Sequence, residues 1–169
     1  MTDAFKNIAV TSFPDITKVD FKSIENQYLK VILINTFVAF LVLFSVICLG
    51  DYKGLFKFIE NTIWIYLTFT LCFVFTLLIK TIEFKKRRYV VREKDISYKK
   101  GVLFRSITTV PFNRIQHVEI DEGPISRFLG LVSLSVFTAG DSSDDLKISG
   151  LLKQEATQIK EFISNKIDG

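Results

Sequence analysis

Two long uncharged apolar segments constrain this chain more than any other feature of its sequence. Residues 31–50 contain no charged side chain, and fourteen of these twenty residues are Val, Ile, Leu or Phe. Residues 62–79 add eighteen uncharged positions, eleven of them of the same four types. As helices rising about 1.5 Å per residue, the segments would measure roughly 30 and 27 Å, close to the thickness of the hydrocarbon core of a bilayer. We therefore predict a two-helix membrane hairpin over residues 31–79.

The composition agrees with a chain that lies partly in lipid. Of 169 residues, 49% are hydrophobic and the mean hydropathy is +0.31, which is high for a soluble domain of this length. The first segment is not a signal peptide, because thirty mixed residues precede it. Cys48 and Cys72 both lie in the apolar segments, so they indicate buried or lipid-facing thiols and not a disulfide or a metal pair.

The net charge of +4 arises in one part of the chain. Residues 80–105 carry ten Lys or Arg against three acids, directly after the second apolar segment. This position favours membrane orientation over nucleic-acid binding, so no nucleic-acid partner is expected. Because basic residues gather on the cytoplasmic side, we expect both termini to be cytoplasmic and residues 51–61 to form a short external loop.

Polar residues inside the predicted spans have two interpretations. Their hydroxyls and amide either bond to carbonyls of their own helix, which we favour, or bridge to another helix. Neither span holds an ionisable group other than the two thiols, which argues against transport by this chain alone. The polar residues are Asn35, Thr36, Ser45, Thr68, Thr70 and Thr76.

Residues 1–30 are expected to form a cytoplasmic N-terminal segment. Phe21, Ile24, Tyr28 and Val31 recur at helical spacing after a potential cap at Asp20, which predicts an interfacial helix leading into the first span. A solvated segment is the simplest interpretation, and a docking surface is the alternative.

Residues 80–169 are predicted to form a small cytoplasmic α+β domain. Dense β-branched residues and turn signals indicate strands over residues 89–92, 96–99, 102–110, 115–121, 131–139 and 146–149. Residues 125–129 suggest a short helical piece, stopped by Gly130. Residues 153–167 predict an amphipathic helix, whose apolar face includes Ala156, Phe162 and Ile163.

This order of elements resembles the pleckstrin-homology (PH) fold, and the detail resembles bacterial PH-domain membrane proteins of the YdbS/YdbT type. The matching stretches are Arg88-Tyr89, residues 100–103, residues 110–118, residues 123–131, residues 136–140 and residues 148–151. The fold expected is thus two transmembrane α-helices followed by a PH-like domain, an antiparallel β-sandwich or partly open barrel capped by a C-terminal helix. The resemblance also implies a bacterial cytoplasmic (inner) membrane location.

Two groups of side chains are candidate functional residues. The first is a basic set that would attract anionic lipid headgroups or a partner: Lys85, Lys86, Arg87, Arg88, Lys99, Lys100 and Arg105. Positive-inside anchoring alone also explains the run at 85–88. The second group comprises residues of the family-like motifs, which we expect to be mainly structural: Arg114, Gln116, Gly123, Pro124, Arg127, Gly130, Thr138 and Gly140.

Several of these motif residues have a specific expectation. Arg114 and Arg127 are expected to hold loop carbonyls or the carboxylates Asp121 and Glu122, with a lipid headgroup or partner carboxylate as the alternative. Gln116 shares the parity of the inward residue Val118, so we expect it to bond to backbone groups.

No motif in the sequence indicates catalysis. His117 lies on the outward parity of its strand, and no Cys, Asp or Ser pattern accompanies it. Asp141, Asp144 and Asp145 lack the spacing of a calcium loop and are expected at a polar hairpin tip. Glycine-rich phosphate loops, nucleophile elbows and zinc-protease motifs are missing. We expect no metal, no cofactor and no enzymatic activity.

The function predicted is a non-enzymatic, membrane-anchored interaction module. The family resemblance implies a subunit of a membrane complex in envelope defence, such as resistance to antimicrobial peptides or bacteriocins. Its expected partners are membrane lipids and another PH-like membrane subunit or further copies of this chain. The alternative is a sensor that binds anionic lipid at the inner leaflet.

Overall fold

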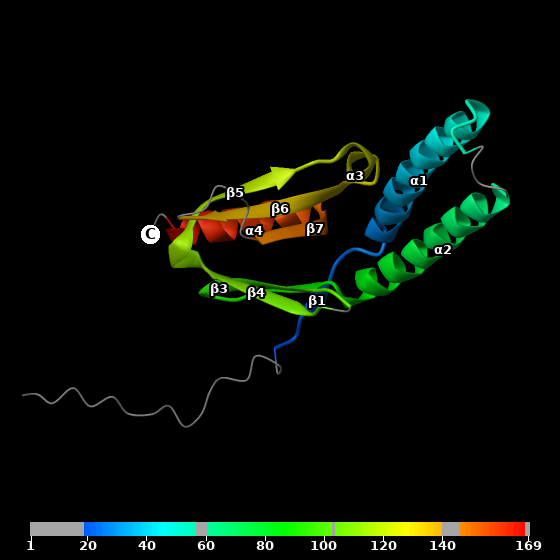
Figure 1. Ribbon diagram of the computed structural model, residues 1–169. Coiled ribbons are helices and arrows are strands. Elements are labelled where there is room, and N and C mark those ends of the chain that lie inside the picture. The colour runs from blue at the N-terminus through cyan, green and yellow to red at the C-terminus, as the bar shows by residue number, and fades with distance from the viewer. Residues whose placement is uncertain (1–18, 57–60, 103, 140–145, 168–169) are drawn as a thin grey trace, which may run out of the picture.

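The computed structural model describes residues 19–56, 61–102, 104–139 and 146–167, and its two longest elements are helices. Helix α1 (Tyr28–Tyr52) and helix α2 (Ile63–Lys86) lie side by side and project from one end of a β-rich domain (Figure 1). Both helices are long and apolar enough to cross a membrane, and almost none of their surface is buried inside the molecule. The predicted order of two apolar helices, antiparallel sheets and a C-terminal helix is confirmed.

Aromatic rings join the two long helices along their length. The ring of Phe40 lies 5.0 Å from that of Phe73 and 5.4 Å from that of Phe69, and Phe44 lies 5.7 Å from Phe69. The hydroxyls of four polar residues bond to carbonyls one turn earlier in the same helix, as expected for Ser and Thr in apolar helices. These residues are Thr36, Ser45, Thr70 and Thr76. The intrahelical interpretation is confirmed for them.

The domain consists of two antiparallel sheets that face each other as layers (Figure 1). The four-stranded sheet has the order β1 (Lys22–Ser23), β2 (Arg88–Val91), β3 (Asp95–Lys100) and β4 (Ser106–Pro111). The three-stranded sheet has the order β5 (Ile115–Asp121), β6 (Leu131–Thr138) and β7 (Leu146–Leu152). A 3-10 turn, η2 (Phe112–Arg114), links β4 to β5, and a short helix, α3 (Pro124–Phe128), links β5 to β6.

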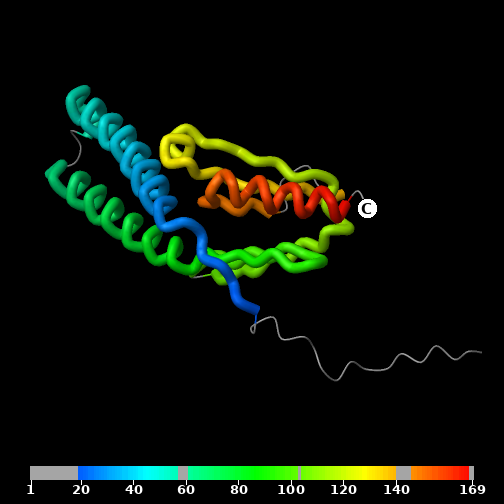
Figure 2. The backbone as a smooth tube through the Cα atoms, turned by 180° about the vertical axis from the view of Figure 1, so that it is seen from behind, coloured from blue at the N-terminus to red at the C-terminus, as the bar shows by residue number. Residues whose placement is uncertain are grey.

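One hydrophobic core fills the space between the sheets. Ile96 and Val110 of one sheet and Leu134 and Ile148 of the other belong to a single cluster. Helix α4 (Lys153–Ile167) contacts β5, β6, β7 and η2, and Figure 2 shows it running along the side of the sandwich. Its bounds agree with the predicted helix. Inward and outward residues alternate at the start of β7, where Leu146 and Ile148 are buried and Lys147 is exposed, whereas β3 and β6 contain consecutive buried residues.

Two strands differ from their predicted extents because glycines adopt positive φ angles. Gly101 has φ of +94°, which extends the turn after β3, and β4 therefore begins at Ser106 instead of Val102. Gly150 has φ of +88°, and β7 continues past it to Leu152 with a shift in register between Val132 and Ser133 of β6.

Residues 22–25, which precede α1, are part of the domain, so their interpretation as a solvated lead-in is wrong. Lys22 and Ser23 pair with Tyr89 and Arg88 of β2, and the next residue, Ile24, is 4% exposed within the core. The expected interfacial helix over residues 20–31 begins only at Tyr28, because residues 22–23 are held as a strand. The backbone N–H of Glu25 also donates to the carbonyl of Gly150 at 2.9 Å.

Helix α4 buries fewer of its apolar residues than its pattern predicts. Ala156 and Ile163 are fully buried, whereas Phe162 remains 40% exposed. Phe162 packs edge-on against Phe112 of η2, with their ring centroids 6.0 Å apart. It therefore lies at the border of the core, because the sheets end near η2.

Candidate membrane-proximal cationic site

The direct passage from α2 into β2 gathers most of the predicted basic residues at one end of the domain. Lys85 and Lys86 form the last turn of α2, and Arg88 opens β2 after a single extended residue. In the sheet, Arg88 lies opposite Lys99, and Lys100 lies opposite Ser106. The turn that carries Arg105 therefore lies at the same end of the sheet as the end of α2.

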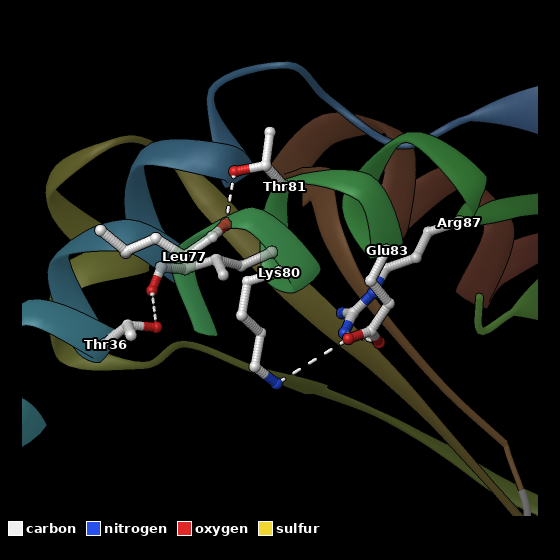
Figure 3. Close-up of polar contacts among 7 residues, drawn as sticks. Thr36, Leu77, Lys80, Thr81, Glu83 and Arg87 are labelled. Carbon is white, nitrogen blue, oxygen red and sulfur yellow. Dashed lines mark hydrogen bonds and ion pairs between the residues drawn. The ribbon is translucent and has the colours of Figure 1, made fainter. Parts of the chain in front are cut away.

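Arg87 is separated from this set because its side chain turns back along α2. Its Nη2 donates to Glu83 Oε1 at 2.7 Å, and Lys80 Nζ lies 3.8 Å from the other oxygen of the same carboxylate (Figure 3). The side chain of Arg87 is only 18% exposed. Its Nε atom is buried without a hydrogen-bond partner among the described residues. Arg87 is therefore paired with a carboxylate of α2 and presents little charge to solvent.

The remaining cations form no ion pair with an acidic side chain in the described part of the chain. Lys85, Lys86, Arg88, Lys100 and Arg105 are exposed, and Lys99 is half-buried. Arg88 and Lys99 are directly opposite on neighbouring antiparallel strands, so both side chains leave the same face of the sheet. Two like charges in such a cross-strand pair are mildly destabilising unless an anion lies nearby. We name these six residues the cationic site.

The cationic site has the chemistry of a surface for anionic headgroups. Each basic side chain held near an anionic leaflet contributes about 1 kcal/mol, and the attraction decays within a Debye length. The charges come from two strands, one turn and a helix end, and they line no enclosed cavity that the structure describes. Such an arrangement attracts anionic surfaces with little headgroup selectivity.

The glycines and proline of the family-like motif form the short link between β5 and β6. Gly123 precedes α3, Pro124 occupies its first turn, and Gly130 ends it with φ of +66°. The N–H of Arg127 closes the turn by donating to the carbonyl of Gly123 at 2.9 Å. Arg127 Nε lies 3.9 Å from Glu122, at the outer limit of an ion pair, so the pairing expected with Glu122 is weak.

Three other motif residues lie at the end of the sandwich opposite the cationic site. Arg114 is exposed in η2 at the opposite end of β5 from α3, and it contacts neither Asp121 nor Glu122. Gln116 is exposed where the register of β5 shifts between Ile115 and His117, so the inward direction expected from parity is wrong. Thr138 ends β6 opposite Ile115, and Gly140 lies outside the described residues.

Two carboxylates beside α3 are held by lysines of β7 and α4. Asp121 accepts hydrogen bonds from Lys147 Nζ at 3.0 Å and Ser135 Oγ at 2.8 Å, and these bonds lower the pKa of the carboxyl. Glu122 lies 2.7 Å from Lys153 Nζ, and this contact likewise lowers the pKa of Glu122. Both acids therefore fix the β5–α3 junction onto neighbouring elements.

Sequence reasoning missed the cluster that binds the N-terminal segment to α4. Glu155 of α4 accepts hydrogen bonds from the Tyr89 hydroxyl of β2 and from Lys22 Nζ of β1. Burial, followed by the bond to Glu155, raises the pKa of Tyr89 well above its usual value. A two-residue strand has no periodicity, so the only available signal was the apolar Ile24 before the first span.

The remaining residues considered for chemistry lie apart from one another. His117 is exposed and stacks on Phe137, with ring centroids 4.4 Å apart. Asp141, Asp144 and Asp145 lie outside the described residues. Across the described ranges, no group of three or more His, Cys, Asp or Glu side chains is placed to hold a metal ion.

The layered sheets, the terminal helix and the two preceding spans define a membrane protein with a PH-like domain. A family model described as "Bacterial PH domain" matches residues 29–167, and the chain belongs to this family. The match includes both apolar helices, except the first residue of α1, and strands β2 to β7, but not β1.

A curated relative is similar over part of the chain. It is the UPF0699 transmembrane protein YdbS of Bacillus subtilis (strain 168), which is 29% identical over 87 residues. The match covers 52% of this chain and 53% of the relative, so the chain spans about half the length of the relative it matches. No solved structure matches the chain.

Proposed function

We propose that this protein is a non-enzymatic interaction module anchored in the bacterial cytoplasmic membrane, with both termini in the cytoplasm. It works as a subunit of a membrane complex with another PH-like membrane protein or with further copies of itself. Its family resemblance supports a role in envelope defence, through resistance to antimicrobial peptides or bacteriocins.

One observation supports the proposal: residues on both sides of the membrane hairpin belong to the sheet and the core of the sandwich. Residues before α1 pair with β2, and β2 follows α2 after one residue. Ile24 before α1 and Phe84 of α2 both belong to the buried core. A domain fused in this way is held at a defined position above the membrane, as required of a module that contacts membrane neighbours.

The test is affinity purification of tagged full-length protein after mild detergent extraction, followed by mass spectrometry. The proposal expects a stoichiometric protein partner, or a homo-oligomer in size-exclusion chromatography with light scattering. A matched control is the same protein with Ile24→Asp, which disturbs the joint between hairpin and sandwich. A monomer that carries only lipid would contradict the complex.

The cationic site favours a second candidate function, which is binding of anionic lipid at the inner leaflet. Arg88 and Lys99 repel each other across the strands and lack acidic partners among the described residues. An anionic headgroup would relieve that repulsion.

This second function is tested by native mass spectrometry of the full-length protein with phosphatidylglycerol. Replacing both Arg88 and Lys99 by Gln should reduce lipid retention by roughly 2 kcal/mol, about thirtyfold, with strong dependence on salt. Arg114→Gln is the control, because Arg114 is also an exposed cation but lies at the far end of the sandwich, beside the start of β5. Equal retention by both variants would exclude a role for the cationic site.

A further inference from the structure

Helix α3 presents an unusually exposed phenylalanine beside the membrane hairpin. Phe128 is 91% exposed, although residues of its size and apolarity are normally covered in a folded domain. It ends a one-turn helix formed between Pro124 and Gly130. A tight turn closed by proline and glycine holds this ring outward, because the left-handed Gly130 directs the chain back into β6.

The fold places α3 at the level where α1 becomes free of charge. Helix α3 contacts α1, and Figures 1 and 2 both show it beside the first half of that helix. The uncharged segment of α1 begins at Val31, which is 3% exposed, directly after the exposed Lys30. Through α3, the domain therefore contacts α1 close to the point where the uncharged segment of that helix begins.

The polar residues around α3 fit the boundary between headgroups and acyl chains. Arg127 is exposed next to Phe128, and Lys153 is exposed where α4 begins. Both acidic neighbours are paired with lysines: Glu122 lies 2.7 Å from Lys153 and near Arg127, and Asp121 lies 3.0 Å from Lys147. An apolar ring flanked by cations with long apolar stems is typical of segments that lie in the membrane interface.

We propose that α3 is a third membrane contact, in which Phe128 enters the cytoplasmic leaflet beside α1 and Arg127 reaches the lipid phosphates. This inference rests on the proposed anchoring of the hairpin in the membrane. It goes further by giving the PH-like domain its own lipid contact, separate from the cationic site at the end of α2. The motif of Gly123, Pro124 and Gly130 then has a function, which is to shape the turn that enters the lipid.

The test places a tryptophan on α3 in the full-length protein. The chain has one tryptophan, Trp64, so Phe128→Trp is made in a Trp64→Phe background. The protein is reconstituted in vesicles of phosphatidylglycerol and phosphatidylcholine, with bromine on the acyl chains near the carbonyl end. The control is Phe162→Trp in the same background, because Phe162 lies near the C-terminal end of α4, away from the hairpin.

The inference expects brominated lipid to reduce the emission at position 128 by about twofold, as for a ring buried at the headgroup boundary. The emission at position 162 should not change. Long-wavelength emission at position 128 without quenching would overturn the inference. Short-wavelength emission without quenching would also overturn it, because protein, such as a second copy of the chain, would then cover the ring.

Quenching of Trp64 in the wild-type protein tests the anchoring of the hairpin independently of the contact made by α3. Trp64 lies in α2, so brominated lipid should quench it if the hairpin is embedded. Quenching of Trp64 without quenching at position 128 overturns only the contact of α3. If Trp64 is not quenched either, both the embedded hairpin and the contact of α3 are wrong.

Discussion

Gly150 shows how a single residue joins the N-terminal segment to the sandwich. It adopts φ of +88°, and a Cβ atom there would lie 2.5 Å from Cγ of Tyr28 and 2.8 Å from its Cβ. The missing side chain lets the first residue of α1 pack directly on β7. A glycine is therefore required here for its conformation and also for the space it leaves.

We predict that Gly150→Ala lowers the free energy of unfolding by about 3 kcal/mol, because left-handed strain and steric overlap add. Gly130→Ala is the matched control. Gly130 has φ of +66°, but a Cβ atom there would meet no heavy atom within 4 Å, so strain alone should cost about 1–2 kcal/mol. Pulse proteolysis of the full chain in micelles across a urea series measures both, and equal losses would contradict the steric account.

Asp121 gives a prediction of pH dependence at the same scale. Hydrogen bonds from Lys147 and Ser135 lower its pKa in the folded state, so the contact stabilises the fold above the unfolded pKa near 3.8. The stabilisation is lost as the pH falls through the lowered folded value. Because the ion pair is nearly half exposed, we expect Asp121→Asn to cost only about 0.5–1 kcal/mol at pH 7.

The measurement for Asp121 is the difference in unfolding free energy between wild type and Asp121→Asn at neutral and acidic pH. The difference should shrink as the pH is lowered below about 4. Glu119→Gln is a suitable control, since Glu119 is exposed on the same strand and, among the described residues, its side chain forms an ion pair with His117 and with no Lys or Arg. A difference that stays constant with pH would show that Asp121 acts through its shape and not through its charge.

At the scale of elements, substitutions in α4 show which of its residues stabilise the packing of the helix on the sandwich. Ile163 is fully buried in the core, whereas Phe162 is 40% exposed beside Phe112. We predict that Ile163→Asp unfolds the domain, because an unpaired carboxylate in the core costs an amount comparable to the stability of the whole domain, about 5 kcal/mol. Phe162→Asp should be clearly milder, at about 1–2 kcal/mol.

Protease resistance of full-length protein and its near-ultraviolet circular dichroism distinguish these two variants. Loss of both signals in Phe162→Asp, with retention in Ile163→Asp, would reverse the assigned packing of α4.

Sequence patterns predicted the long and periodic elements well. The apolar segments and the α4 pattern are long enough for one interpretation to dominate, and β5 alternates over most of its length. Strand β1 could not be predicted, since two residues have no period and their pairing depends on β2, far later in the chain. Gln116 was misassigned because a register shift breaks the alternation, and a single sequence gives no sign of that shift.

The candidate site was predictable as a group of residue types but not as an arrangement. The charges after α2 are evident in the sequence, yet the opposition of Arg88 and Lys99 depends on strand register. Arg87 looked equivalent to its neighbours, although its spacing of four residues from Glu83 on a helix was a signal for the ion pair that the structure shows. The exposure of Phe128 likewise depends on the turn around it, because a short apolar stretch predicts burial.

At the scale of the whole molecule, the charge distribution predicts the topology. Both termini should be cytoplasmic, because the basic residues after residue 79 outnumber those of the loop between the helices. Single cysteines at Asn61 and Lys160, in a background with Cys48 and Cys72 replaced by alanine, test this in intact cells. An impermeant thiol reagent should label position 61 and not position 160. The reverse pattern would invert the topology.

The pairing of β1 with β2 has a mechanical consequence for the whole protein. Strand β1 leads into α1 and β2 leads out of α2, so the chain leaves and re-enters the sandwich through two adjacent strands. A domain joined to the membrane by one flexible linker would rotate freely. This domain is attached both before α1 and after α2, so its orientation relative to the hairpin is restricted. A change in the tilt of either helix in the bilayer therefore strains the sandwich. The strain acts first on the two-residue ladder between β1 and β2, because this ladder joins the strands next to the two helices.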